Sequence, residues 1–507
     1  MKIMFSVNTW LYDIMIRTYP LWKDRGIEII YDLFLTKHYK YLKRNLPDLD
    51  RFSWSLFPEF ILQIWHSVDI SDKNISRLEN KYGCRLIEMI IYDVSMYKYN
   101  ARPYDVMCNE EYWRRYFISS IQYYEDLLDK HKPDFIFGEG PHGIAMKVLF
   151  EISKKRAIPY FAIEGSYIED RIRFTYGRTS KSFALEHYYN NHGLLREKDY
   201  RMADNLINKI KLYKQLPYYQ QRYGNKISLF PKNRNTLRVF NIIGQFFSYC
   251  FYRYNAINHI RLLLEGKSNP LWELFVLRFL KYNNYRYVMK KKCTKINLED
   301  NYIVYFNHFQ PEATTSVCAP YYENQSNLIE NIIKSLPGTS KLYIKEHSTD
   351  LGNRGKSFYQ NLLYYPAVKL IDPLFNSIEL IENCQMVFTI SGTVGLEAIM
   401  LNKPVGVFSD CYYNFFPGIK RIYSPEEIPS AINWGLKEYN VEELLMERFV
   451  AAYIKSLYPT KIAFPFLEDE KILSKKENVM EFVNGILDFI KDYRRYGWDK
   501  YIYTRKK

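Results

Sequence analysis

The sequence predicts an α/β protein with two Rossmann-like domains, a basic helical segment between them and helices at the carboxyl end. Strand-like and helix-like runs alternate in two separate parts of the chain, which is typical of parallel, doubly wound sheets. Between those parts, from about Ala184 to Cys293, the pattern is helical and basic. After Ser424 the chain reads helical to its end.

The expected elements of the first part are strand Ile3–Val7, helix Trp10–Asp24, strand Ile27–Leu33, strand Phe135–Phe137, helix Ile144–Arg156 and strand Pro159–Ile163. Those of the second part are strand Tyr302–Phe306, helix Leu328–Leu336, strand Lys341–Lys345, helix Ser377–Asn383, strand Cys384–Ile390, helix Leu396–Leu401 and strand Pro404–Phe408.

These elements predict four regions. Residues 1–183 and 299–423 each form a Rossmann-like domain, residues 184–298 a basic helical linker, and residues 424–507 helices that pack back on the first domain. Two Rossmann-like domains facing a cleft are the plan of GT-B-like proteins, although a fold alone does not establish a function.

Composition limits the class of protein further. Hydrophobic residues make up 47% of the 507-residue chain and aromatic residues 17%, which excludes a disordered protein. No apolar run reaches the roughly 18 residues of a membrane-spanning helix, and the first ten residues do not resemble a secretory signal. The seven cysteines are scattered without CxxC spacing, so we expect reduced thiols and a cytoplasmic location.

The net charge of +15 is concentrated in one segment. Residues 205–295 are rich in Lys and Arg and contain only Glu265 and Glu273 as acids, and they include the aromatic run "FFSYCFYRY" (Phe246–Tyr254). Interleaved bases and aromatics suit an anionic membrane surface or an acidic ligand. A basic linker whose aromatics pack inward is the alternative. No nucleic-acid-binding motif accompanies the segment, so a nucleic-acid partner is not expected.

Three stretches of the second part place polar residues directly after a strand: "YFNHFQPEATTS" (Tyr305–Ser316), "LYIKEHSTD" (Leu342–Asp350) and "TISGTVGLEAIMLNKPVGVF" (Thr389–Phe408). The carboxyl ends of parallel strands meet at one edge of a sheet, where α/β proteins bind ligands. The small-residue turn of the third stretch would present backbone N–H groups at a helix N-terminus, where an anion binds. A turn with only a packing role is the alternative.

Lys345 ends a predicted strand and His347 lies two residues beyond it, so strand alternation places both side chains on one side. Taken alone, Lys345 could be a solvated residue at a strand end, and His347 could have a purely structural role. Beside a helix N-terminus, however, they form a phosphate pocket. Together with the turn they favour a nucleoside diphosphate or monophosphate as the leaving group.

"HFQPEATTS", "LYIKEHS" and "TISGTVGLEAIMLNKPVGVFSDCYY" resemble, in this order, the signature of the bacterial capsular polysaccharide biosynthesis family, which includes the Kdo transferases of capsule assembly. The resemblance spans Tyr302–Tyr413. It implies a GT-B fold, a location on the cytoplasmic face and transfer of a sugar from a nucleotide-activated donor to a growing glycan. One position departs from the family's K-x-H-P pattern: Ser348 replaces the proline, which loosens the expected loop geometry.

The resemblance assigns these residues to the donor: Gln310, Glu312, Thr314, Lys345, His347, Ser391, Gly392, Thr393 and Glu397. The basic pair would contact the donor phosphate, and the S-G-T turn (residues 391–393) would donate N–H and hydroxyl groups to it. Glu397, in the first turn of the following helix, would hold ribose hydroxyls. Its alternative role is to complement the helix dipole.

The acceptor side needs a general base that removes the proton of the attacking hydroxyl. The loop "FGEGPHG" offers Glu139 and His142, and "IEGS" offers Glu164 on the next strand end. A carboxylate between two glycines is closely approached, which suits a catalytic loop; a polar loop that satisfies its own backbone is the alternative. We expect Glu139 to be the base, supported by the other two residues. No Asp-x-Asp triplet stands at a strand end, so we expect neither a metal nor another cofactor.

Several functions remain open at this stage. The first is a glycosyltransferase, peripheral on the inner face of the cytoplasmic membrane, with a nucleotide-sugar donor and a glycan or lipid-linked glycan acceptor. A CDP-polyol phosphotransferase of surface polymer synthesis, a non-catalytic glycan-assembly protein and a UDP-sugar epimerase are the alternatives. The resemblance suggests a CMP-linked ulosonic acid as donor, and UDP-sugars stay possible.

Overall fold

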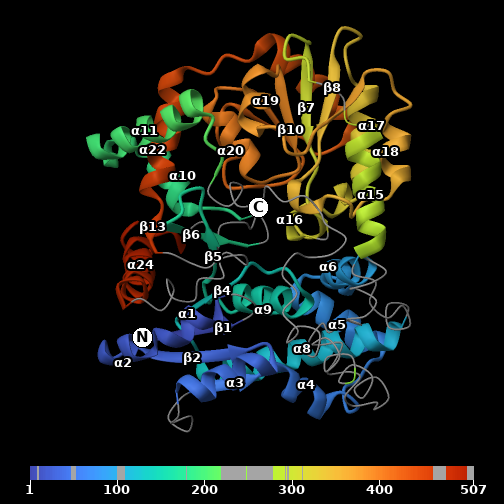
Figure 1. The fold of residues 1–507 in the computed structure, drawn as a ribbon. Helices are drawn as coiled ribbons and strands as arrows, with labels where there is room; N and C mark the ends of the chain where they lie inside the picture. Colours follow the sequence, from blue (N-terminus) through green and yellow to red (C-terminus); the bar gives the residue numbers. More distant parts are fainter. Residues whose placement is uncertain are drawn as a thin grey trace. The chain divides into compact units, whose positions relative to one another are not determined.

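The computed structural model describes residues 1–7, 11–46, 53–99, 109–177, 180–217, 247, 278–291, 293, 296–310, 312–460 and 476–499. Their contacts divide the chain into two compact units. Unit 1 holds the described residues of Met1–Phe183, Phe247–Ser268 and Leu457–Lys507, and unit 2 those of Ala184–Phe246 and Asn269–Ser456. Each unit is built around its own sheet (Figure 1).

Within the described residues, the sheet of unit 1 has seven strands in the order β13-β6-β5-β4-β1-β2-β3. The strands are β1 (Lys2–Val7), β2 (Glu28–Leu33), β3 (Ser53–Leu56), β4 (Phe135–Gly138), β5 (Tyr160–Gly165), β6 (Arg171–Tyr176) and β13 (Tyr458–Pro459). The strands from β5 to β3 are parallel, whereas β6 pairs antiparallel with both β5 and β13.

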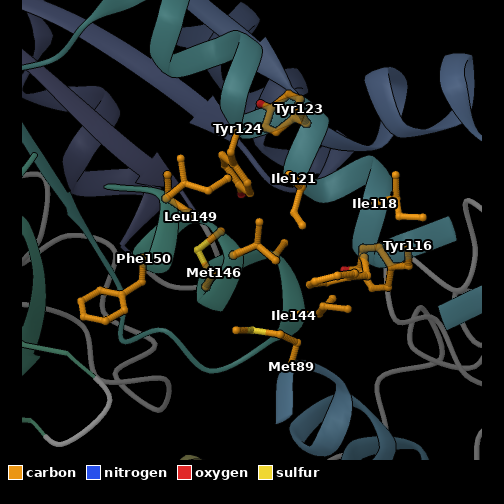
Figure 2. Close-up of a cluster of buried hydrophobic side chains, with 14 of the residues drawn as sticks. Met89, Tyr116, Ile118, Ile121, Tyr123, Tyr124, Ile144, Met146, Leu149 and Phe150 are labelled. Carbon is orange, nitrogen blue, oxygen red and sulfur yellow. The ribbon is translucent and has the colours of Figure 1, made fainter. Parts of the chain in front are cut away.

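The helices of unit 1 pack around this sheet (Figure 1). They are α1 (Tyr12–Arg17), α2 (Tyr19–Asp24), α3 (Thr36–Asn45), α4 (Phe57–Ile64), α5 (Asp72–Tyr82), α6 (Leu86–Tyr99), α8 (Glu110–His131), α9 (Ile144–Lys155) and α24 (Lys476–Arg495). Figure 2 shows apolar side chains of α8 and α9 meeting in one buried cluster, among them Ile121, Tyr124 and Leu149. This core fixes the start of α9 and, with it, the loop after β4.

Helix α24 contributes an aromatic side chain to the same unit. Phe489 is buried, and its ring lies 4.4 Å from that of Phe174 and 4.7 Å from that of Phe161, measured between centroids. The C-terminal helix is therefore part of the core of unit 1.

We expect Phe489→Ala to lower the free energy of unfolding by about 3–5 kcal/mol, because it removes buried apolar surface and leaves a cavity. Met480→Ala on the same helix is the control, since its partly exposed side chain should cost far less. Thermal or denaturant unfolding measures both. Equal losses would show that α24 is not anchored through this aromatic cluster.

Within the described residues, the sheet of unit 2 has six strands in the order β12-β11-β10-β7-β8-β9, and every neighbouring pair is parallel. The strands are β7 (Tyr302–Phe306), β8 (Lys341–Lys345), β9 (Val368–Ile371), β10 (Met386–Thr389), β11 (Val405–Val407) and β12 (Ile419–Arg421). The helices are α10 (Phe183–Asn190), α11 (Glu197–Tyr213), α15 (Arg278–Lys291), α16 (Ala313–Ser316), α17 (Gln325–Lys334), α18 (Lys356–Leu362), α19 (Ser377–Asn383), α20 (Thr393–Met400), α21 (Ile428–Asn433) and α22 (Glu443–Lys455).

The α/β class is confirmed, and the structure corrects three details of the prediction. The expected helix over 10–24 is two helices, α1 and α2, because Pro20 has no N–H to donate to the Ile16 carbonyl. The chain after Ser424 is not entirely helical, since β13 adds a short strand at the sheet edge. The sheet of unit 1 is not wholly parallel, because β6 runs antiparallel to both of its neighbours, β5 and β13.

Most of the basic segment lies outside the described residues. Its described parts are the end of α11, the helix α15 and a few flanking residues. The aromatic run Phe246–Tyr254 falls outside them except for Phe247, whose side chain is exposed. No helix of the described chain is long and apolar enough to cross a membrane.

Candidate functional site

The three polar stretches of the second half meet at one edge, as predicted. Strands β10, β7 and β8 are direct neighbours and parallel, so the residues that follow them emerge at the same edge of the sheet. We call this edge, with the residues after these strands, the carboxyl edge of unit 2. In α/β proteins such an edge is the usual ligand site.

The S-G-T turn connects β10 to α20 at this edge. Gly392 has φ +97°, a conformation that side-chain-bearing residues rarely adopt, and it precedes the first helical residue, Thr393. The helix therefore starts earlier than the predicted Leu396. As a consequence Glu397 lies in the second helical turn, not in the first, so it does not cap the helix dipole.

A buried histidine that the sequence analysis did not single out holds this turn. Nε2 of His308, after β7, accepts the N–H of Ile390 at 3.0 Å and lies 3.4 Å from the Ser391 nitrogen. The Thr389 hydroxyl is 2.9 Å from the same nitrogen and donates to the Ser391 carbonyl at 2.7 Å. Burial, with the nearby His347 and Arg354, lowers the pKa of His308 to about 3, so the ring is neutral and Nε2 stays an acceptor.

The Ser391 N–H, one of the donors expected to serve an anion, is thus directed at His308. The Gly392 carbonyl accepts the hydroxyl of Tyr413 at 2.8 Å. His308 lies inside the quoted "HFQPEATTS" stretch, directly after a strand, and that position was the signal available for finding it.

Two buried ionisable side chains, a lysine and a glutamate, lie at the carboxyl edge of unit 2. Lys345, the last residue of β8, donates to the Pro373 carbonyl at 2.8 Å, and Glu397 is fully buried in α20. Burial lowers the pKa of Lys345 to about 8 and raises that of Glu397 to about 8, while each charge partly offsets the shift of the other. Among the described residues, neither carboxyl oxygen of Glu397 has a hydrogen-bond partner. A buried carboxyl without partners is costly unless a ligand supplies them.

The polar residues after β7 form hydrogen bonds with their surroundings and with one another. The Gln310 amide donates to the Glu323 carbonyl at 2.6 Å, and its oxygen accepts from Arg354 at 2.7 Å. Glu312 precedes α16 and accepts the Thr314 hydroxyl at 2.7 Å. Burial raises the pKa of Glu312. Gln310 therefore has a structural role in shaping the edge, and the other two form a local pair beside it.

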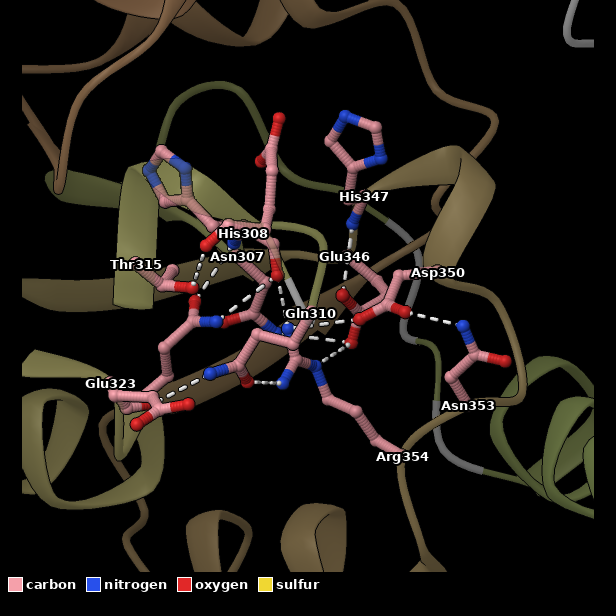
Figure 3. A network of polar contacts seen from close by, with 12 residues as sticks. Asn307, His308, Gln310, Thr315, Glu323, Glu346, His347, Asp350, Asn353 and Arg354 are labelled. Carbon is pink, nitrogen blue, oxygen red and sulfur yellow. Dashed lines mark hydrogen bonds and ion pairs between the residues drawn. The ribbon is translucent and has the colours of Figure 1, made fainter. Parts of the chain in front are cut away.

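His347 lies two residues beyond β8 and is exposed. Its backbone N–H donates to Glu346 at 3.0 Å, and its ring lies 6.3 Å from that of Phe309. Figure 3 shows the imidazole pointing away from the buried network around Glu346 and Arg354. The ring of His347 is accordingly accessible from solvent, unlike that of His308.

In unit 1, Glu139 follows β4 in the predicted loop. Its side chain is buried, and its carbonyl accepts the hydroxyl of Tyr160 at 2.5 Å. Both flanking glycines are closely approached: a Cβ at Gly138 would lie 3.0 Å from the Ser6 carbonyl, and one at Gly140 would overlap the His142 ring unless the ring moved. The loop is thus a tight, well-packed turn that carries one carboxylate.

His142 and Glu164 lie in the same unit with different surroundings. Burial lowers the pKa of His142 to about 4, while the charge of Glu164 opposes this shift. Nδ1 of the ring has no hydrogen-bond partner in the part of the chain that the structure describes. Glu164, in β5, pairs with Arg173 at 2.7 Å and accepts the hydroxyls of Thr175 and Ser180, both at 2.9 Å. Burial raises its pKa, but these partners outweigh that and lower it, so Glu164 is held as an anion.

Across the described residues no group of three or more His, Cys, Asp or Glu side chains is placed to hold a metal ion. The carboxyl edge of unit 2 carries a buried lysine, Lys345. The fold and this edge define the chain as an α/β protein with a candidate anion site built from a lysine, a buried carboxyl and a helix N-terminus.

The chain belongs to the capsule polysaccharide biosynthesis protein family, whose profile matches residues 151–454. Among solved structures it is similar to two of Thermosulfurimonas dismutans KpsC. The beta Kdo 2,4 transferase has 15% identity and a TM-score of 0.38, covering 65% of this chain and 82% of that one. The beta Kdo 2,7 transferase has 13% identity and a TM-score of 0.37, covering 73% and 96%.

A UDP-GlcNAc 2-epimerase from Methanocaldococcus jannaschii is also similar, with 14% identity and a TM-score of 0.24 over 90% of this chain and 98% of that one. A comparison with curated proteins found no match.

Proposed function

We propose that this protein is a glycosyltransferase that moves a sugar from a nucleotide-activated donor to a growing capsular or other surface polysaccharide. Membership of the capsule polysaccharide biosynthesis family supports a polysaccharide as the product. The observation that carries the donor assignment is the buried carboxyl of Glu397, which has no hydrogen-bond partner among the described residues. It lies within the electrostatic field of Lys345, on the helix that begins at the S-G-T turn. A lysine and a helix N-terminus attract phosphate, and a carboxylate accepts hydrogen bonds from a diol. A nucleotide carries both groups.

In the proposed reaction the acceptor oxygen bonds to the anomeric carbon, and the bond from that carbon to the donor phosphate breaks. The electron pair of the broken bond stays on the phosphate, whose charge Lys345 and the N-terminus of α20 offset without a metal ion. Glu139 takes the proton of the acceptor hydroxyl, with support from His142 and Glu164. A CMP-linked ulosonic acid is the proposed donor, and a glycan or lipid-linked glycan the proposed acceptor.

Product analysis tests this proposal against its alternatives. The protein is incubated with a capsular glycan and either a CMP-linked ulosonic acid or a UDP-sugar, and the products are followed by ³¹P NMR. We expect all phosphorus to leave as free nucleotide while the glycan gains one sugar. A phosphodiester retained in the polymer after incubation with a CDP-polyol would identify a phosphotransferase. Sugar conversion without acceptor would identify an epimerase, and no turnover of any donor a non-catalytic protein.

We further propose that the protein acts at the inner face of the cytoplasmic membrane through residues 205–295. Basic side chains near an anionic surface contribute about 1 kcal/mol each, so a few of them suffice for attachment. In liposome flotation we expect binding to vesicles that contain anionic lipid, and release at high salt. Equal binding to neutral vesicles, or none to either, would contradict this part of the proposal.

A further inference from the structure

Arg354 is a buried cation that lies outside all three polar stretches yet contacts two of them. Its Nε donates to Glu346 at 3.0 Å, and one terminal nitrogen donates to the Gln310 side chain at 2.7 Å. The other terminal nitrogen pairs with Asp350 at 3.1 Å and donates to the His308 carbonyl. Figure 3 shows these acceptors arranged around the one guanidinium.

The contacts of Arg354 continue to the S-G-T turn through His308. The His308 peptide is held on both sides: Gln325 accepts its N–H at 2.8 Å and donates to its carbonyl at 3.0 Å, and Arg354 donates to the same carbonyl. With its backbone fixed, the His308 ring is placed to accept the Ile390 N–H. Arg354 thus acts on the turn through one intermediate residue.

The charge of Arg354 is also required where it lies. Glu346 and Asp350 are both buried, and a buried carboxylate without a partner is strongly destabilising. Glu346 has further donors in Tyr359, at 2.8 Å, and Asn307, at 3.1 Å. Only a planar guanidinium with five donors reaches acceptors in four directions, and a lysine ammonium does not reproduce this geometry.

We propose that Arg354 is a positioning residue of the donor site: it touches no ligand and holds the carboxyl edge of unit 2 in its binding geometry through His308. This inference rests on the proposed function for the ligand, but its mechanical part concerns the protein alone. The two parts are tested by separate readouts.

The first readout is hydrogen–deuterium exchange of the Ile390 and Ser391 amides. In Arg354→Lys, which keeps the charge, we expect their exchange to accelerate by about tenfold, the factor that corresponds to one lost hydrogen bond. The matched control is Arg115→Lys in unit 1, where Nε donates to Glu111 at 2.8 Å and a terminal nitrogen to the Trp65 carbonyl at 2.7 Å. It should leave both amides unchanged. Unchanged exchange in Arg354→Lys would overturn the proposal.

The second readout is the affinity for CMP, CDP, UDP and GDP, used as probes. The nucleotide that wild type binds best should bind Arg354→Lys about tenfold or more weakly and Arg115→Lys equally well. If Arg354→Lys does not fold, His308→Ala cuts the same link without unpairing a buried charge, and the same two changes are expected of it. Full affinity in a variant with accelerated exchange would overturn the positioning role. If wild type binds none of the probes, the proposed function fails, and the exchange result still decides whether Arg354 holds the turn.

Discussion

Glu139→Gln is expected to lower turnover by about 10²–10⁴-fold while leaving nucleotide affinity unchanged, because general-base catalysis typically contributes that factor. The amide keeps the size of the carboxyl but does not take a proton. The loop should keep its shape, since it is fixed by close glycine contacts and by the Tyr160 hydroxyl on the Glu139 carbonyl. The measurement is kcat with saturating donor, together with equilibrium nucleotide binding.

Two comparison variants test whether the turnover lost in Glu139→Gln reflects the loss of the general base. His347→Ala should lose nucleotide affinity as well as rate if the exposed imidazole contacts the donor phosphate from the ground state onward. Glu164→Gln should lose stability first, because glutamine offers one acceptor oxygen instead of two, so either Arg173 or the two hydroxyls lose their acceptor. Near-normal turnover in Glu139→Gln would move the base role to His142 or Glu164. Equal loss of nucleotide binding in Glu139→Gln and His347→Ala would show that the loop is structural.

Glu397→Met is expected to stabilise the ligand-free protein by about 1–3 kcal/mol and to abolish nucleotide binding. The carboxyl is fully buried, and neither oxygen has a partner among the described residues, so replacing it with an apolar side chain of similar length removes an uncompensated desolvation cost. The same change removes the proposed acceptor of the ribose hydroxyls. Glu330→Met is the control, because Glu330 is a half-buried glutamate in α17. It should change neither the free energy of unfolding nor nucleotide binding appreciably.

The pKa of Glu397 predicts how the free energy of unfolding changes with pH. Burial raises the pKa of Glu397 from 4.5 to about 8, so between these values the folded protein holds a proton that the unfolded chain has lost. Stability of the wild type should therefore fall as pH rises from about 4.5 to about 8. The advantage of Glu397→Gln over wild type should grow across this window and level off above it, in urea unfolding at each pH. If the difference in free energy of unfolding between Glu397→Gln and wild type stays constant from pH 4.5 to 8, the pKa of Glu397 is not raised by folding.

The carboxyl edge of unit 2 could be predicted because its evidence is local. Each polar stretch follows an apolar run long enough to read as a strand, and the parallel alternation then brings the strand ends together. The start of α20 was misplaced because Thr393, Val394 and Gly395 are weak helix formers, and only the Gly392 backbone shows where the turn ends.

Long-range contacts were not predictable in the same way. The role of His308 depends on an N–H some eighty residues away, and Arg354 looks in the sequence like a solvated loop residue. His308 is defined by a partner that follows β10, and Arg354 by partners that follow β7 as well as by two in its own loop. Neither periodicity nor spacing encodes these contacts. Strand β13 pairs with β6 across most of the chain and is only two residues long, so it leaves no alternation to detect.

The measurement closest to the central claim is nucleotide binding at the carboxyl edge of unit 2 without divalent metal. CMP, CDP, UDP and GDP are titrated into wild type and Lys345→Ala by calorimetry, in EDTA and in Mg²⁺. The account predicts that at least one nucleotide binds with closely similar affinity in both buffers. It also predicts that Lys345→Ala weakens that binding by about tenfold or more, since it removes the buried cation proposed to face the phosphate. Binding that requires Mg²⁺, or that Lys345→Ala leaves intact, would contradict the account.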